Sequence, residues 1–231
     1  MTPPSALAAA LARAIAPGRP IESGDGDGAI ARDARLLDEM LASDGKASTV
    51  RLWVNRRCLV VPRAWAGRPG FDAASAAAAD GGWPVHFRES GGSAVVHRPG
   101  ILNVSLFHAA PADPLGIDEA YGRLVSLLVA ALGALGVEAD AGPVAGSYCD
   151  GRFNIRVGGR KLAGTACRIR RTTRRVAVLA HAVVSVEGDP AGDVAVVAAF
   201  ERALGLPAAY RIDRHCTLEQ VLAARLNSPE C

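Results

Sequence analysis

The sequence predicts an α+β fold with a mixed, largely antiparallel sheet and flanking helices. Two observations carry this prediction. At 231 residues the chain can bury a full core, as one large domain or at most two small ones. Its short apolar or alternating runs, bounded by Gly and Pro, are interleaved irregularly with helical segments, whereas regular alternation would favour a parallel α/β sheet. We therefore expect a single domain over 1–231, with an N-terminal helical segment over 1–47, a core over 48–190 and C-terminal helices over 191–231.

The N-terminal segment predicts two helices, over 5–16 and about 29–42. Between them lies the Gly/Asp-rich stretch 22–28, whose composition resembles that of an oxygen-ligand metal loop. It lacks the closing Glu of a calcium hand, so we interpret it as a flexible connector.

Alternation of apolar and polar residues begins at position 48 and predicts strands. They are expected at 49–54, 58–62, 85–88, 93–96, 102–106, 152–157, 160–168 and 176–186. Gly158 and Gly159 stand between two of these runs and predict a type I′ hairpin turn.

Four more helices are expected, over 71–80, 118–135, about 194–204 and 218–226. The second of these has the strongest amphipathic pattern. Asp118 and Glu119 lie at its positive end, and Gly136 follows its last turn, as in a capped helix.

Charge and apolar runs exclude several classes of protein. With 26 Lys+Arg against 23 Asp+Glu and a net charge of +3, the basic excess is too small for a dedicated DNA-binding protein. The longest apolar runs, 5–16 and 124–135, are interrupted by Arg or Gly and are too short to span a membrane. No basic residue precedes the first run, so we expect no secretory signal.

The cysteines favour a reducing compartment. The five cysteines form an odd set without a CxxC pair, which matches neither a disulfide framework nor a zinc site. We expect free thiols, no metal site and a cytoplasmic protein. The cysteines are Cys58, Cys149, Cys167, Cys216 and Cys231.

Lysine is scarce in this chain. Only Lys46 and Lys161 are lysines, and the other 24 basic residues are arginines. Because Lys161 follows Arg160 directly, an ordinary surface cation there would be expected as Arg. Lysine is a compact point charge that fits beside a carbonyl or a thiolate where a planar guanidinium does not. A chance exposed lysine is the alternative, and Lys46 fits that description.

Two segments contain chemically suggestive residues. Arg88-Glu-Ser-Gly-Gly-Ser-Ala-Val-Val-His97 is a Gly-rich stretch whose backbone N–H groups could face a carboxylate, a phosphate or an acyl carbonyl. Taken alone, Ser-Gly-Gly-Ser is more often a hairpin turn. It is no P-loop, since no Gly-Lys-Ser/Thr follows. Gly146-Ser-Tyr-Cys149 places a thiol on a polar loop twelve residues before Lys161. A nearby ammonium would lower the pKa of that thiol and favour a nucleophilic thiolate.

Together these segments resemble a known family. Arg88 to His97 with Leu102-Asn-Val-Ser105 is similar to the Arg-rich Ser-Gly-Gly-Gly segment of lipoate ligases and octanoyltransferases, which share a fold with the biotin ligase catalytic domain. Gly159-Arg-Lys-Leu-Ala-Gly-Thr-Ala166 resembles their Gly-Arg-Lys-Ile-Ala-Gly-Ser/Thr-Ala-Gln segment. Gly146-Ser-Tyr-Cys149 resembles the branch that transfers octanoyl from the glycine cleavage H protein to other proteins.

The resemblance implies an acyltransferase of protein lipoylation with a thioester on Cys149. Lys161 would hold the thiolate and polarise the acyl carbonyl. The expected donor is octanoylated glycine cleavage H protein, and the acceptors are lipoyl domains of 2-oxoacid dehydrogenase complexes, with no cofactor required. The implied substrate-binding residues are Arg88, Ser90, Gly91, Gly92, Ser93, His97, Asn103, Asn154, Gly164, Thr165 and Ala166.

Two other functions stay open. An ATP- and Mg-dependent lipoate-protein ligase without the accessory domain is the first, and a non-catalytic module that binds lipoyl domains is the second. Three residues depart from the family pattern: Ser93 replaces the third glycine, Glu89 stands where ligases often have Arg, and Cys167 stands where Gln is usual. Glu89 would disfavour a nearby phosphate and weakens the ligase interpretation. Cys167 is either a rival thiol or a small strand residue.

Two further groups of residues carry paired interpretations. His97, His108 and His181 are either partners of a thiolate or hydrogen-bonded core and rim residues. An arginine cluster, between Arg168 and Arg175, either complements the acidic surface expected of a lipoyl domain or forms a solvated hairpin end. The cluster consists of Arg168, Arg170, Arg171, Arg174 and Arg175.

Overall fold

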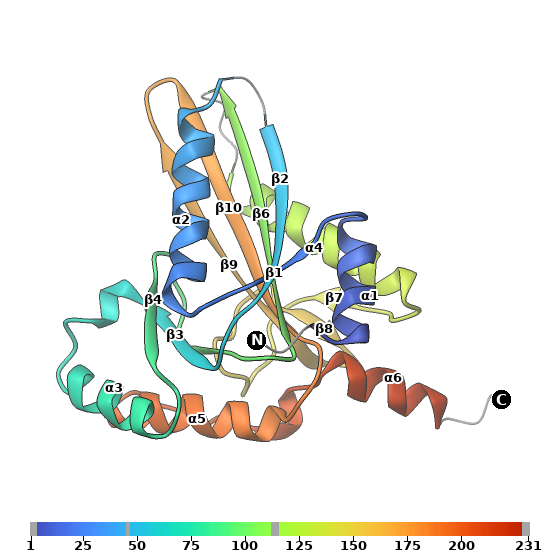
Figure 1. Ribbon diagram of the computed structural model, residues 1–231. Helices are drawn as coiled ribbons and strands as arrows, with labels where there is room; N and C mark the ends of the chain where they lie inside the picture. The colour runs from blue at the N-terminus through green and yellow to red at the C-terminus, as the bar shows by residue number, and fades with distance from the viewer. Residues whose placement is uncertain (1–3, 45–46, 112–115, 228–231) are drawn as a thin grey trace.

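The computed structural model describes residues 4–44, 47–111 and 116–227 (Figure 1). Lys46 and Cys231 lie outside these ranges. The main sheet has the strand order β1-β2-β6-β10-β9-β8-β7. Its neighbours pair antiparallel, except β1 with β2, which confirms the predicted mixed, largely antiparallel sheet. The strands are β1 (Ile21–Ser23), β2 (Ala47–Val54), β6 (Ile101–Pro111), β7 (Asp140–Ala141), β8 (Ile155–Val157), β9 (Arg160–Arg171) and β10 (Arg175–Ser185).

A second sheet of three strands has the order β4-β3-β5. Its central strand β3 (Cys58–Pro62) is buried along its whole length and pairs parallel with β4 (Val85–Arg88) and antiparallel with β5 (Val95–His97). Helices α3 (Phe71–Asp80) and α5 (Pro190–Ala203) run beneath this sheet in Figure 1. Their aromatic side chains pack against β3, β4 and β5 in one cluster.

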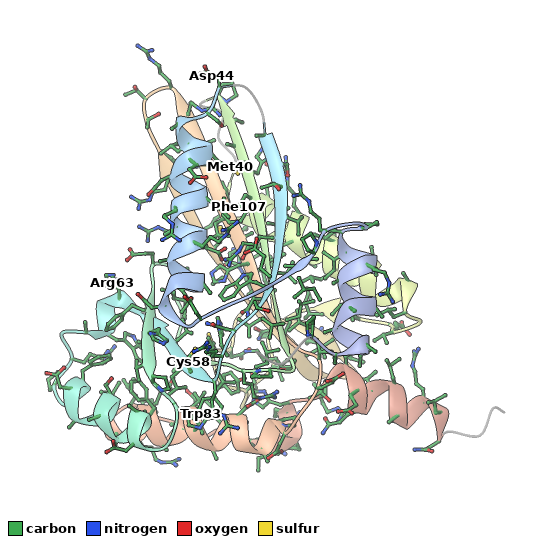
Figure 2. All side chains as sticks on the ribbon, in the orientation of Figure 1. Met40, Asp44, Cys58, Arg63, Trp83 and Phe107 are labelled. Carbon is green, nitrogen blue, oxygen red and sulfur yellow. The ribbon has the colours of Figure 1, made fainter. Side chains whose placement is uncertain are left out.

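Helices cover both faces of the main sheet. The side chains of its long strands point alternately to the two faces, and both sets include apolar residues that must be buried. On one face, Ala180, Ala182 and Val184 of β10 pack against α1 (Ala6–Ile15), α4 (Ile117–Ala134) and α6 (Leu218–Leu226). On the other face, α2 (Asp27–Ala42) runs along β6 and β10. Figure 2 labels Met40 of α2 and Phe107 of β6, which belong to the cluster between this helix and the sheet.

In the N-terminal segment, the second helix begins two residues earlier than predicted, and strand β1 was not predicted. Stretch 22–28 is no flexible connector, because β1 begins at Ile21 and α2 at Asp27. The amide of Asn55 holds the stretch by accepting from Gly26 N at 2.8 Å and donating to Gly26 O at 3.2 Å. Local composition could not reveal either the parallel pairing or this distant amide.

The later strands agree with the prediction except at their ends and except for the short strand β7, which was not predicted. Positions 152–154 form a turn, since Asn154 N donates to Gly151 O at 3.1 Å, and β8 starts only at Ile155. Conversely, β6 and β9 are longer than expected because β10 pairs with both along its length. Gly158 and Gly159, with φ of 56° and 72°, form the turn predicted between β8 and β9. Two short 3-10 turns, Arg63–Trp65 and Ile212–Arg214, complete the chain.

None of the helices in the described part of the chain combines the length and hydropathy needed to cross a membrane.

Candidate active site

A cavity of about 170 Å³ lies between the two sheets and α2. Its walls are mainly apolar, and a few polar groups converge on it, which is the usual composition of a small-molecule site. Apolar lining comes from Ile30, Ala31, Ala34, Trp53, Val60, Phe87, Val95, Leu179 and Val183. Cys149 lies in the wall, so the thiol loop borders this mainly apolar cavity.

Cys149 occupies a strained position. Its φ of 47° makes it the one residue other than glycine with a positive φ among the described residues. Such a backbone is costly for a side chain bearing Cβ and concentrates at functional sites. Gly146, at φ 85°, and the turn at Gly151 bound the loop. Asp150 fixes it further, accepting from Val144 N at 2.7 Å and from Asn154 Nδ2 at 2.8 Å.

The Gly-rich segment after β4 folds over the Cys149 thiol. Ser93 N donates to Cys149 Sγ at 3.4 Å. Gly92 has φ 101°, and a Cβ there would lie 3.1 Å from the sulfur. Buried Arg88 holds the segment by donating to Gly91 O at 2.9 Å and to Ser93 O at 2.6 Å. The Gly-Gly pair is therefore not a hairpin turn but a loop closed around the thiol.

Lys161 lies beneath the same loop, buried in β9. Its Nζ donates to the backbone oxygens of Tyr148 at 2.6 Å and Cys149 at 2.7 Å, and it lies 5.1 Å from the centre of the Tyr148 ring. Gly164, three residues further along β9, leaves the ammonium room, because a Cβ there would be 3.2 Å from Nζ. The ammonium thus stabilises the unusual backbone of Cys149 and acts on the thiol through space.

Opposing effects set the protonation of this thiol. Burial raises the pKa of Cys149, but the charges of Lys161 and Arg88 and the Ser93 N–H on its sulfur outweigh burial and leave the pKa below its usual value. Burial lowers the pKa of Lys161, and the Cys149 and Asp150 charges oppose that shift. The two groups therefore favour each other's charged forms, as an activated cysteine requires.

Neutral histidines line the interior of the cavity. Burial, with the Arg88 charge, lowers the pKa of both His97 and His181 to about 3. His181 Nε2 shares a 2.8 Å hydrogen bond with Ser90 Oγ, and the His97 ring packs edge-on against Trp53 with centroids 5.3 Å apart. These contacts favour the core-residue interpretation of the histidines over that of thiolate partners.

Oppositely charged side chains lie at the exposed rim of the cavity. Glu89 forms ion pairs with Arg63 at 2.6 Å and with Arg168 at 3.3 Å. A carboxylate that already occupies both guanidinium groups leaves them poorly available to a phosphate. Arg170, the next member of the arginine cluster on this face, pairs with Asp38 of α2 at 3.5 Å.

The structure gathers most of the predicted site residues around one space. Arg88, Ser90, His97, Cys149, Gly164, Thr165 and Ala166 line the cavity, while Gly91, Gly92, Ser93 and Lys161 surround the thiol loop. Asn103 and Asn154 lie outside the lining. Asn103 Nδ2 donates to Trp53 O at 3.3 Å, and Asn154 supports Asp150.

Cys167 points away from the cavity. It follows Ala166 on β9, so its side chain takes the opposite face and packs beside Ala120 and Val178. Burial raises the pKa of Cys167 to about 11. The structure thus favours the small strand residue over the rival thiol.

The sequence prediction missed Asp33 and Trp53. Asp33 lines the cavity from α2 and is buried with Arg51, whose Nη1 donates to it at 2.7 Å; Ser105 Oγ donates to its other oxygen at 2.6 Å. Burial raises the pKa of Asp33, and Arg51 opposes that shift. A signal was present: Ala29, Asp33 and Leu37 share one buried helix face at i, i+4 spacing, so a carboxylate stood on the apolar side.

Comparison with known proteins identifies the family. Residues 25–224 match the model of the lipoyl protein ligase A/B catalytic domain. The chain belongs to this family. The solved structure of a lipoate-protein ligase A bound with ATP shares the fold, with a TM-score of 0.67 and 21% identity over 88% of this chain and 76% of that one. A putative lipoate protein ligase from T. acidophilum with bound lipoic acid also shares it, at TM-score 0.57 and 19% identity over 90% and 94% of the chains.

Among relatives in this family, the octanoyl-[GcvH]:protein N-octanoyltransferase of Kyrpidia tusciae is 39% identical over 170 residues, covering 70% of this chain and 57% of the relative. The protein of the same name from Geobacillus kaustophilus is 34% identical over 61% of this chain and 49% of its own. An uncharacterised protein of Cupriavidus necator is 37% identical over 82% and 79% of the two chains. The match thus spans about half the length of the octanoyltransferases.

Proposed function

We propose that this protein is an octanoyl or lipoyl protein N-acyltransferase of the amidotransferase type. The observation that carries the proposal is the thiol of Cys149 at an apolar cavity, with Ser93 N–H on its sulfur and Lys161 beneath it. The relatives named octanoyl-[GcvH]:protein N-octanoyltransferase support the same reaction. By analogy with that name, the donor is octanoylated glycine cleavage H protein, and the acceptor is a lysine of a lipoyl domain.

In the first step, the Cys149 thiolate attacks the acyl carbon of the donor's octanoyl-lysine amide. A C–S bond forms and the C–N bond breaks, while the leaving lysine nitrogen takes up from solvent a proton equivalent to the one that the Cys149 thiol lost on ionising. In the second step, the unprotonated ε-amine of the acceptor lysine attacks the thioester. A C–N bond forms, the C–S bond breaks, the nitrogen gives up one proton to solvent and the thiolate returns. The apolar cavity would hold the acyl chain in both steps, and the Lys161 ammonium would stabilise negative charge on the acyl oxygen.

The proposal is tested by intact-mass measurement after incubation with octanoylated H protein. An adduct of one octanoyl group, removable by hydroxylamine, is expected on the wild type and absent from Cys149→Ala. Cys167→Ala is the matched control and should still form the adduct. An adduct that persists in Cys149→Ala would contradict the assignment of the nucleophile.

The same assay separates the alternatives. The ligase interpretation, favoured by the likeness to an ATP-bound fold, requires pyrophosphate release from ATP and Mg with free octanoate or lipoate. Glu89 between Arg63 and Arg168 argues against it, because the carboxylate offsets part of the positive charge that an adenylate phosphate would need there. A non-catalytic module would bind a lipoyl domain and form neither product. We accordingly propose that no cofactor is needed and that the protein works in the cytoplasm, where its thiols stay reduced.

A further inference from the structure

The side-chain hydroxyl of Ser93 has no assigned role in this reaction. Its oxygen is buried and has no hydrogen-bond partner among the described residues. A buried hydroxyl without a partner destabilises a fold, so it calls for an explanation. The family motif that this segment resembles has glycine at the same place, so the backbone path does not require a serine.

Three consecutive backbone groups fix Ser93 next to Cys149. Its N–H donates to Cys149 Sγ at 3.4 Å, and its carbonyl accepts from Arg88 Nη2 at 2.6 Å. The following N–H, of Ala94, donates to the buried Glu201 Oε1 at 3.1 Å. With its backbone held on both sides, Ser93 can move its hydroxyl only by rotation about χ1.

Two possible hydrogen-bond acceptors lie near that hydroxyl. Tyr210 already donates its own O–H to Glu201, so its oxygen is a neutral acceptor. Burial and Glu201 raise the pKa of Tyr210, so its hydroxyl stays uncharged. The other acceptor is the sulfur of Cys149, which becomes an anion when it reacts. Hydrogen bonds to ionised acceptors are roughly twice as strong as those between neutral groups.

We propose that the Ser93 hydroxyl is a second hydrogen-bond donor to the Cys149 thiolate, beside the Ser93 N–H. While the thiol is protonated, the hydroxyl stays without a partner, and it pairs when the proton leaves. The buried hydroxyl is unpaired beside the thiol and paired beside the thiolate, so its burial favours the thiolate of Cys149. This inference rests on the proposed use of Cys149 as nucleophile, but its test needs no acyl substrate.

The test measures alkylation of Cys149 by iodoacetamide against pH, followed by mass spectrometry of the Cys149 peptide in the full chain. Ser93→Ala is expected to slow alkylation about tenfold at neutral pH, because a lost hydrogen bond to a charged group moves thiol ionisation by about one pH unit. The rates should converge at high pH. The melting temperature of Ser93→Ala should be unchanged or higher, since an unpartnered buried hydroxyl is removed.

Ser147→Ala is the matched control, because Ser147 Oγ is also buried without a hydrogen-bond partner among the described residues. It should reproduce the thermal effect and leave the alkylation profile unchanged. Ser93→Thr keeps the hydroxyl and should restore the rate. Alkylation of Ser93→Ala within twofold of wild type, or equal slowing in Ser147→Ala, would overturn the proposal. Failure of the octanoyl adduct with an intact Ser93 effect would reject the acyltransferase function instead.

Discussion

Cys149 shows at the scale of one residue how strain and charge are combined. Its φ of 47° lies in the left-handed region, which residues other than glycine rarely adopt. The residue stays there because Lys161 holds its carbonyl and the adjacent one. The same ammonium favours the thiolate, so one buried charge serves both geometry and ionisation. This accounts for a lysine persisting in a chain that otherwise uses arginine.

Lys161→Met tests this dual role. We expect alkylation of Cys149 at neutral pH to fall at least about tenfold, because an opposite charge within a few ångströms shifts a pKa by roughly one to three units. The iodoacetamide rate against pH provides the measurement. Lys161→Arg is the companion variant: it keeps the charge but not the compact shape, so it should recover the thiolate only partly. A pH profile identical to wild type in Lys161→Met would contradict the role.

At the scale of an element, the segment between β4 and β5 acts as a clamp on the thiol loop. The sequence alone left a hairpin turn open for it, whereas the structure places it against a loop more than fifty residues away. Arg88 fixes the clamp from within, and Glu201 of α5 fixes it from behind. Such long-range contacts within the chain explain why local propensity could not decide between the two interpretations.

Gly92→Ala tests the close approach within this clamp. A Cβ would meet Cys149 Sγ at 3.1 Å and Arg88 Nη2 at 3.0 Å, and φ of 101° strains any L side chain. We expect at least about a hundredfold loss of octanoyl adduct formation, since a displacement of about 1 Å at a reacting group can cost that much. Gly122→Ala in α4, where a Cβ meets nothing within 4 Å, is the control and should keep full activity. Unimpaired acylation of Gly92→Ala would refute this geometry.

At the scale of the whole molecule, the cavity exists because three layers meet on one side of the main sheet. β9 and β10 supply one wall, the small sheet another, and α2 the cover. Burial keeps three histidines uncharged. It lowers the pKa of His97 and His181 in the cavity wall to about 3, and, together with the Lys161 charge, that of His215 beside Tyr148 to about 4. In the unfolded chain, each histidine takes up its proton as the pH falls through about 6.5, the ordinary pKa of histidine.

Stability should therefore fall as the pH drops below about 6.5. Between that pH and about 4, the unfolded chain binds protons that the folded chain rejects, so the free energy of unfolding decreases with falling pH. Each histidine contributes up to about 1.4 kcal/mol per pH unit. Urea denaturation at several values between pH 7.5 and 5 measures this slope, and His97→Gln should make it shallower. A free energy of unfolding that is constant from pH 6.5 to 5 would contradict the prediction.

The sequence by itself determined the fold class and most strands and helices, and it predicted Cys149 and Lys161 as candidate catalytic residues. Alternation, turn glycines and a rare lysine are local features, so a single chain displays them directly. Only the tertiary structure decided that Lys161 bonds to backbone carbonyls, that Ser93 meets the thiol and that Asp33 enters the cavity. These contacts join elements far apart in the chain, and they depend on how helices and sheets pack, which no local pattern encodes.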